Sequence, residues 1–446
     1  MHHYHRQHPR LRGTHLAAAS PSFPAGSLSP AQILTAYGFK QNQFAGIPSV
    51  KLGVGSLGGG VVQADIDASV ARWGMVAPKL TVRTVDGAVN DPVSDQDSNV
   101  ENMLDIIPTM AFTWWFLTGE AADITITFGP NIGTGMALVT EDLVTAGAQV
   151  VSWSWGSAAD QWLPSDRAAL AKAFADGVAK GVTFFAAAGD NSIDDGTSSP
   201  SADYPCSDPN VWAVGGTHLT IDSSGARSDE AAWGDGNAGD EGGGGGFDPT
   251  VPMPSFQNGV VPGSARGVPD TSANADPNTG WQMSANGSWT VIGGTSASSP
   301  FTAALVAVAR GVAKGAISGR LTADVYTARA TACNDITEGS NGDPAAAGWD
   351  PATGLGSPNG DAFISAISSV APPAPPTTGP APTPPIPPPP LPTPPAPPPP
   401  APPPAVSLGQ AELWAVDGIR NHWSPPVTLE QVQEWASLGL KNHWPK

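Results

Sequence analysis

Charged residues are scarce in this chain, and basic residues are the scarcer kind. Only 13% of the 446 residues are charged, with 39 acidic against 20 basic side chains and a formal net charge of −19. Nucleic acids and anionic membrane surfaces both attract a basic face, so the sequence argues against either as a partner. A sparse, acidic surface suits low pH, where carboxylates lose their charge and few cations remain to repel one another.

Cysteine, long apolar runs and a recognisable targeting segment are also rare or missing. The two cysteines, Cys206 and Cys333, leave one disulfide or none open, and no CxxC metal-binding spacing occurs. No apolar run is long enough to span a membrane, so we expect no transmembrane segment. The first twenty residues carry five histidines and three arginines but lack the apolar region of a signal peptide.

Composition divides the chain into four segments. We predict a disordered tail over residues 1–27 and a globular domain over residues 28–370. Residues 371–406 are nearly all Pro, Ala and Thr, which cannot form a packed core and predict an extended polyproline II linker. Residues 407–446 form a separate small module.

The terminal module is a tandem repeat. A Leu…Trp-Ala…Asn-His-Trp pattern begins at Leu408 and recurs from Leu429. Each copy predicts one helix followed by an Asn-His-Trp turn, so we expect a small helical repeat module. Its exposed tips, Trp423 and Trp444, either bind a surface or sugar or simply hold the module together.

Strand-like and helix-like patterns alternate within the globular segment. Residues 166–180 place Ala, Leu and Phe at helical spacing. Apolar runs typical of buried parallel strands occur at Lys51–Val54, Ile124–Phe128, Gln149–Trp155 and Val182–Ala188. This alternation predicts an α/β domain with a largely parallel sheet.

A candidate nucleophile lies in the sequence GGTSASSP, which starts at Gly293 and leads into an apolar run. Pro300 favours the first turn of a helix, so Ser296 is predicted to lie at that helix's amino end. There the helix dipole and free N–H groups favour developing negative charge, as an acyl-transfer nucleophile requires. A Ser/Thr-rich helix cap is the alternative explanation of the same pattern.

Histidine, the usual base for such a serine, is almost absent from the globular segment. Of eight histidines, five lie in the first twenty residues and two beyond residue 406, which leaves His218. Its alternating surroundings predict a strand and a structural role. The base for Ser296 is therefore predicted to be a carboxylate.

Glu101 and Asp105 supply a candidate carboxylate pair. Four-residue spacing on a helix places both on one face, and two acids held close together raise one pKa. Such a pair makes a base that works in acid, although an exposed acidic helix face has the same spacing. Pro108 predicts that this helix kinks or ends there.

Further motifs follow in order along the same segment. They are LSPAQILTAYGF from Leu28, VSWSWG from Val151, AAGD from Ala187, GVPDTSANADP from Gly267 and GWDPATGLGSP from Gly348. With these motifs, residues 28–370 resemble the sedolisins, the serine-carboxyl peptidases that use Glu in place of His. The resemblance implies a subtilisin-like α/β fold with a largely parallel central sheet and helices on both faces.

The resemblance also implies roles for single residues. Ser296 would be the nucleophile and Glu101 the general base, with Asp105 orienting Glu101 and sharing its proton. Asp190 would supply the oxyanion hole together with the Ser296 N–H, which makes physical sense only while Asp190 is protonated.

Two further sites follow from the resemblance. Trp155 and Gly156 would line the substrate groove, where glycine lets a strand-like peptide approach the backbone. One Ca²⁺ would be held by a set of oxygen ligands that suits a hard cation. Those ligands are the carboxylates of Asp335 and Asp350 and the backbone carbonyls of Ile336, Ala346 and Gly348.

The expected function is therefore that of a secreted, monomeric endopeptidase that cleaves protein or peptide substrates at acidic pH. Sedolisins are made with an N-terminal prodomain, which here is removed, encoded separately or not needed. Three alternatives stay open: a tripeptidyl-peptidase, a catalytically inactive sedolisin-like binding or attachment protein, and a subtilisin-type enzyme that uses His218.

Overall fold

A computed structural model describes residues 22–368, except 48, 118, 196, 198, 199, 237–240, 316 and 321. The predicted linker and repeat module lie outside the described residues, as does most of the predicted tail. Residues 22–27 pack against the domain, because Phe23 stacks on Trp73 and the Gln282 side chain donates a 3.0 Å hydrogen bond to the Ser27 carbonyl. No described helix is long and apolar enough to cross a membrane.

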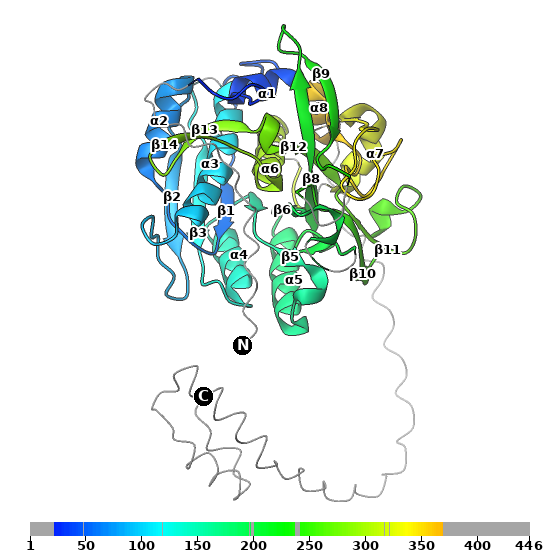
Figure 1. Cartoon of the computed structure of the whole chain (residues 1–446). Helices are drawn as coiled ribbons and strands as arrows, with labels where there is room; N and C mark the ends of the chain where they lie inside the picture. The colour runs from blue at the N-terminus through cyan, green and yellow to red at the C-terminus, as the bar shows by residue number, and fades with distance from the viewer. Residues whose placement is uncertain are drawn as a thin grey trace, which may run out of the picture. The chain divides into compact units, whose positions relative to one another are not determined.

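Eight strands form one central sheet. Figure 1 shows where this sheet lies in the domain. The strand order is β12-β8-β6-β4-β1-β3-β2, all neighbours in this row are parallel, and β9 pairs antiparallel with β8. The strands are β1 (Leu52–Ser56), β2 (Lys79–Thr84), β3 (Asp123–Phe128), β4 (Val150–Trp153), β6 (Thr183–Ala187), β8 (Val211–Ile221), β9 (Arg227–Ala232) and β12 (Thr271–Asn274). The four apolar runs predicted as buried parallel strands are confirmed as β1, β3, β4 and β6.

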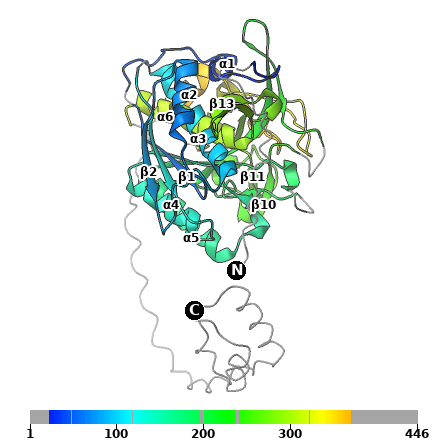
Figure 2. The same cartoon turned by 60° about the vertical axis from the view of Figure 1, so that its left-hand side comes forward.

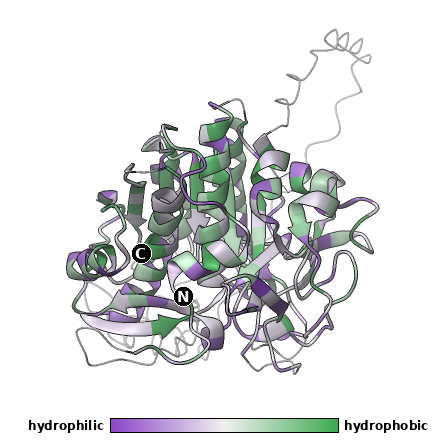
Figure 3. Ribbon diagram, turned by 90° about the horizontal axis from the view of Figure 1, so that it is seen from above, coloured by the Kyte–Doolittle hydropathy of each residue, from purple (hydrophilic) through white to green (hydrophobic). Residues whose placement is uncertain are grey.

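Helices cover both faces of the sheet (Figure 2). The helices α3 and α6 pack on one face and α4 and α5 on the other, so each face has its own apolar core. Figure 3 shows hydrophobic segments gathered through the middle of the domain. The helices are α1 (Pro30–Ala36), α2 (Gln63–Trp73), α3 (Gln96–Phe116), α4 (Gly135–Thr145), α5 (Pro164–Ala179), α6 (Thr295–Val312), α7 (Thr322–Ala332) and α8 (Gly360–Ser368).

Short antiparallel pairs surround this core. They are β5 (Ser157–Ala158) with β7 (Asp203–Tyr204), β10 (Gly246–Pro252) with β11 (Ala265–Val268), β13 (Trp281–Ala285) with β14 (Ser288–Ile292), and β15 (Cys333–Asn334) with β16 (Ser357–Pro358). Single 3₁₀ turns are η1 (Ala159–Gln161), η2 (Ser192–Asp194), η3 (Ser255–Gln257) and η4 (Pro277–Thr279).

The helix that carries Glu101 and Asp105 does not end at Pro108. α3 continues through the proline to Phe116, and the helix is buried over most of its length. Contacts with α6 and the sheet hold the helical path even though Pro108 removes one backbone hydrogen bond. The register therefore keeps Glu101 and Asp105 one turn apart on a continuous helix.

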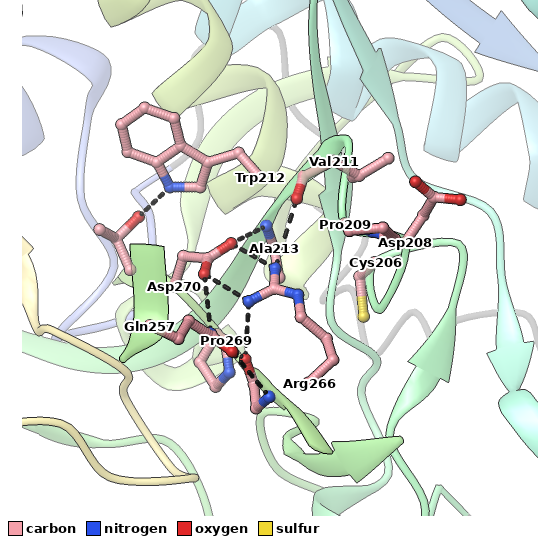
Figure 4. A network of polar contacts seen from close by, with 12 residues as sticks. Cys206, Asp208, Pro209, Val211, Trp212, Ala213, Gln257, Arg266, Pro269 and Asp270 are labelled. Carbon is pink, nitrogen blue, oxygen red and sulfur yellow. Dashed lines mark hydrogen bonds and ion pairs between the residues drawn. The ribbon is translucent and has the colours of Figure 1, made fainter. Parts of the chain in front are cut away.

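A buried ion pair, drawn in Figure 4, links β11 to β8 through the residue that precedes β12. Arg266 of β11 makes two 2.6 Å contacts with Asp270, which also accepts a hydrogen bond from the backbone N–H of Ala213 in β8. Both charged side chains are fully buried. Cys206 lies close to this network, and it and Cys333 are buried thiols with no disulfide, which decides the alternative left open by the sequence.

Candidate active site

The loop that carries Asp190 meets the start of α6, which carries Ser296, at the carboxyl edge of the central sheet. β4 and β6 are parallel neighbours, so the segments that follow them lie side by side. Residues from both segments line an open cleft of about 350 Å³, together with Ser296 at the start of α6. Ligand sites of parallel α/β sheets lie at this edge. Asp190, Trp155 and Gly156 line the same cleft.

Ser296 is the second residue of α6, directly after a tight approach of the backbone to Asp190. Gly294 has φ +122°, and a Cβ there would lie 2.7 Å from Asp190 Oδ2. Glycine is therefore needed both for the backbone conformation and for the space. At this end of α6 the positive end of the helix dipole favours negative charge beside Ser296.

Pro300 does not lie in the first turn of α6, contrary to the prediction. The small residues before it are already helical, because α6 begins at Thr295. Pro300 lacks the N–H that would bond the carbonyl of Ser296, four residues earlier. The Ser154 hydroxyl lies 3.4 Å from that carbonyl oxygen, within hydrogen-bonding distance.

The two carboxyls of α3 form a buried acid pair. Burial raises the pKa of both Glu101 and Asp105 well above their usual values, and the charge of Asp105 raises that of Glu101 further. The Ser296 and Ser154 hydroxyls lie near enough to lower the pKa of Glu101 in part. Within the described residues, however, neither Glu101 oxygen has a partner in hydrogen-bonding geometry. Catalytic hydrogen bonds are often loose without substrate.

Asp190 is held with one oxygen bonded and the other turned toward Gly294. Its Oδ1 accepts two 2.7 Å hydrogen bonds, from the backbone N–H and from the hydroxyl of Thr295. Burial raises the pKa of Asp190 to about 6, assisted by the negative charges of Asp195 and Glu241 and opposed by the two bonds from Thr295. Below that pH the proton belongs on Oδ2, because Oδ1 is already a double acceptor.

Gly156 is required by the protein itself. A Cβ at this position would lie 2.9 Å from the carbonyl oxygen of Tyr204 and 3.2 Å from Pro205 Cδ. The chain around Tyr204 pairs with β5 immediately after Gly156. The sequence-based explanation considered only the approach of substrate, whereas β7 already occupies the space of a side chain here.

Several polar residues of the cleft were missed by the sequence analysis. Ser154 donates a 2.7 Å hydrogen bond to Asp105 Oδ1. Asp195 and Asp203 form a second acid pair, in which burial raises both pKa values and the charge of Asp195 raises the pKa of Asp203 further. Loops after different strands bring these residues together, so no local sequence pattern marks them. Only Thr295 could have been predicted from the sequence, because it lies next to Ser296 in the same motif.

His218 lies away from this cleft. It is on β8, and its Nδ1 is 2.7 Å from Asp276 Oδ2. This hydrogen bond raises the pKa of His218, whose ring is about one third exposed. The residues that line the cleft around Ser296 do not include His218, which agrees with the structural role predicted for it.

The predicted calcium ligands lie on the single loop between β15 and β16. Both oxygens of Asp335 accept from the Gly348 N–H, and Asp350 accepts from the backbone N–H of Ala346. Ile336 is buried. Two carboxylates with backbone carbonyls would be an all-oxygen donor set, the kind of ligand that Ca²⁺ prefers. The described residues contain no cluster of three or more His, Cys, Asp or Glu arranged around a metal position.

Comparison with known proteins agrees with this arrangement. Residues 119–354 match the model of the subtilase family. The chain is 36% identical over 397 residues to kumamolisin from Bacillus sp. (strain MN-32), an alignment that covers 83% of this chain and 70% of kumamolisin. The chain belongs to the sedolisin family of serine-carboxyl peptidases.

Two further comparisons concern sedolisin itself. Sedolisin from Pseudomonas sp. (strain 101) is 34% identical over 207 residues, which cover 41% of this chain and 34% of sedolisin. The solved structure of Pseudomonas sedolisin, a serine-carboxyl proteinase complexed with two molecules of pseudo-iodotyrostatin, superposes with a TM-score of 0.67 at 27% identity. That superposition covers 78% of this chain and 99% of the sedolisin chain, so the subtilisin-like fold is confirmed.

Proposed function

We propose that this sedolisin-family chain is an endopeptidase that works at acidic pH through Ser296, Glu101, Asp105 and Asp190. The observation that carries the proposal is the convergence of these groups from three elements. The Ser296 hydroxyl and the charges of Asp105 and Asp190 all act on the buried Glu101 carboxyl. The described residues that line the cleft include no histidine, and Glu101 and Asp105 are buried on α3 rather than in the cleft lining.

In this mechanism Glu101 moves the proton. An ionised Glu101 takes the hydroxyl proton as Ser296 Oγ attacks the peptide carbonyl carbon. The protonated Glu101 then gives that proton to the leaving amine, and water hydrolyses the acyl-enzyme by the reverse sequence. Asp105 shares a proton with Glu101, so the pair carries one negative charge over the working range.

Asp190 acts on the oxygen that becomes negative. A protonated Oδ2 donates to the tetrahedral oxyanion, together with the backbone N–H of Ser296. Activity therefore falls as the pH rises through about 6, the pKa of Asp190. At low pH the limit is protonation of the Glu101–Asp105 pair, which removes the base. The two limits together predict a bell-shaped profile on the acid side of neutrality.

The remaining parts of the proposal concern substrate, metal and location. An extended peptide lies along Trp155 and Gly156 in the cleft that Ser296 shares. The loop between β15 and β16 holds one Ca²⁺ through Asp335 and Asp350, and the ion would supply structural stability far from the reacting atoms. The family relation and acidic working range favour a secreted enzyme.

The decisive assay is the pH profile of cleavage of a quenched casein-like substrate between pH 2.5 and 8. Wild type should show an acid optimum that both Ser296→Ala and Glu101→Ala lose, whereas His218→Ala should keep it. Loss in His218→Ala alone would favour the subtilisin-type alternative. Cleavage by none of the proteins would favour an inactive scaffold, and release of tripeptides only would favour a tripeptidyl-peptidase.

A further inference from the structure

The Ser154 hydroxyl lies between the acid pair and the nucleophile. Ser154 follows β4 directly, and its side chain is nearly buried. Its Oγ is 2.7 Å from Asp105 Oδ1 and 3.4 Å from the carbonyl oxygen of Ser296. This carbonyl is the one that Pro300 leaves without its helical partner, so it is open to a side-chain donor.

We propose that Ser154 is a positioning residue whose hydroxyl changes hydrogen-bond partner with the protonation state of Asp105. This inference rests on the proposed function of Glu101, Asp105 and Ser296. It adds a residue that contacts both the acid pair and the first turn of α6.

The single hydrogen of the Ser154 hydroxyl can be donated to only one partner at a time. A serine hydroxyl has one hydrogen and accepts through its lone pairs. When Asp105 is ionised, Ser154 donates that hydrogen to Oδ1. When the shared proton lies on Asp105 Oδ1, Asp105 becomes the donor, and Ser154 turns its hydrogen to the Ser296 carbonyl. Only in the protonated state does the Ser154 hydroxyl connect Asp105 to the turn that carries Ser296; in the ionised state its hydrogen is used by Asp105.

The groups around Glu101 and Asp105 are consistent with a link between Ser154 and the protonation of this pair. The titratable groups that face the pair are Glu101 and Asp105 themselves on α3 and Asp190 from the loop after β6. Two hydroxyl groups also face the pair: that of Ser154, which follows β4, and that of Ser296 in α6. The Ser154 hydroxyl lowers the pKa of both acids, against the rise that burial causes. It therefore favours the ionised pair that the base function needs.

The test is the pH dependence of kcat and KM in Ser154→Ala, with Ser152→Ala as the matched control. Ser152 is a buried serine of β4 that bonds the hydroxyl of Ser299 on α6 and does not contact the acid pair. Loss of a hydrogen bond to a charged group lowers a rate by roughly tenfold to a hundredfold. We expect a fall of that size mainly in kcat, with the acid limb of the profile moved to higher pH.

Ser152→Ala should keep the acid limb of wild type, and Ser154→Thr, which retains a hydroxyl, should restore most of it. An unmoved acid limb in Ser154→Ala would overturn the inference, even if the variant were less stable. If Ser154→Ala does not fold, Ser154→Cys replaces it, because a thiol is a weak hydrogen-bond donor. A wild-type acid limb in Ser154→Cys would then overturn the inference. Failure of the proposed function is separate, since wild-type activity would then survive Ser296→Ala.

Discussion

Buried acids with raised pKa values make the stability of this domain depend on pH in one direction. The perturbation is a shift from pH 4.5 to pH 7.5, applied to Ser296→Ala so that autolysis is prevented. Glu101, Asp105, Asp190 and Asp203 all have raised pKa values, mainly through burial. A group of this kind binds its proton more tightly when folded. Its stabilisation is present at low pH and is lost as the pH rises through the folded pKa.

Asp190 gives the magnitude. Its pKa rises from 3.8 to about 6, which corresponds to about 3 kcal/mol in total and about 2 kcal/mol between pH 4.5 and pH 7.5. The other raised acids add to this loss in the same direction. Acids whose pKa is lowered, such as Asp142, destabilise the protein only below about pH 4, outside this window. A loss of this size is a large part of a typical stability of 5–15 kcal/mol.

The assay is urea unfolding followed by tryptophan fluorescence at the two pH values, in Ser296→Ala with and without Asp190→Asn. Asparagine keeps the acceptor for Thr295 and cannot ionise, so the pH dependence should shrink by about 2 kcal/mol in the double variant. Equal pH dependence in both proteins would refute the raised pKa of Asp190. Stability that increases toward pH 7.5 in both would refute the wider argument about buried acids.

Three further predictions concern charge, the buried ion pair and the metal. Asp195→Asn removes a negative charge that raises the pKa of Asp190, so the alkaline limb of the activity profile should move to lower pH; an unchanged limb would contradict this coupling. Asp270→Ala leaves the fully buried Arg266 without its partner and should cost about 3–5 kcal/mol in urea unfolding at fixed pH, whereas a change below about 1 kcal/mol would show that the site admits water. Chelation of calcium should lower the thermal unfolding midpoint and added Ca²⁺ should restore it, with Asp335→Asn insensitive to both; a midpoint that chelator does not change would argue against a resident ion.

Much of the scaffold could be predicted from the sequence because buried parallel strands are apolar on both faces. The runs that became β1, β3, β4 and β6 have this property, so their burial left a continuous pattern. The two prolines were harder. Pro108 and Pro300 both lie inside helices, because packing of α3 and α6 against each other and the sheet outweighs one missing hydrogen bond.

Site residues could be predicted from the sequence where they lie together in one short motif. Ser296 follows two glycines and begins a helix, and Glu101 and Asp105 share one helix face. Ser154 and the Asp195–Asp203 pair could not be found in this way. Ser154 contacts Asp105 on α3, 49 residues earlier in the chain. Asp195 and Asp203 come together only through the fold of the segment between them, and small polar residues carry no sequence pattern that identifies a partner.

The central claim is that Glu101 activates Ser296, and trapping of the acyl-enzyme tests it most directly. Wild type would be mixed at pH 4 with a p-nitrophenyl ester of a protected amino acid, quenched in acid within the first turnover and analysed by peptide mass spectrometry. We predict acyl label on the peptide that contains Ser296 in wild type and in His218→Ala, and its loss in Glu101→Gln. Label on another residue, or full labelling of Ser296 in Glu101→Gln together with its loss in His218→Ala, would contradict the account.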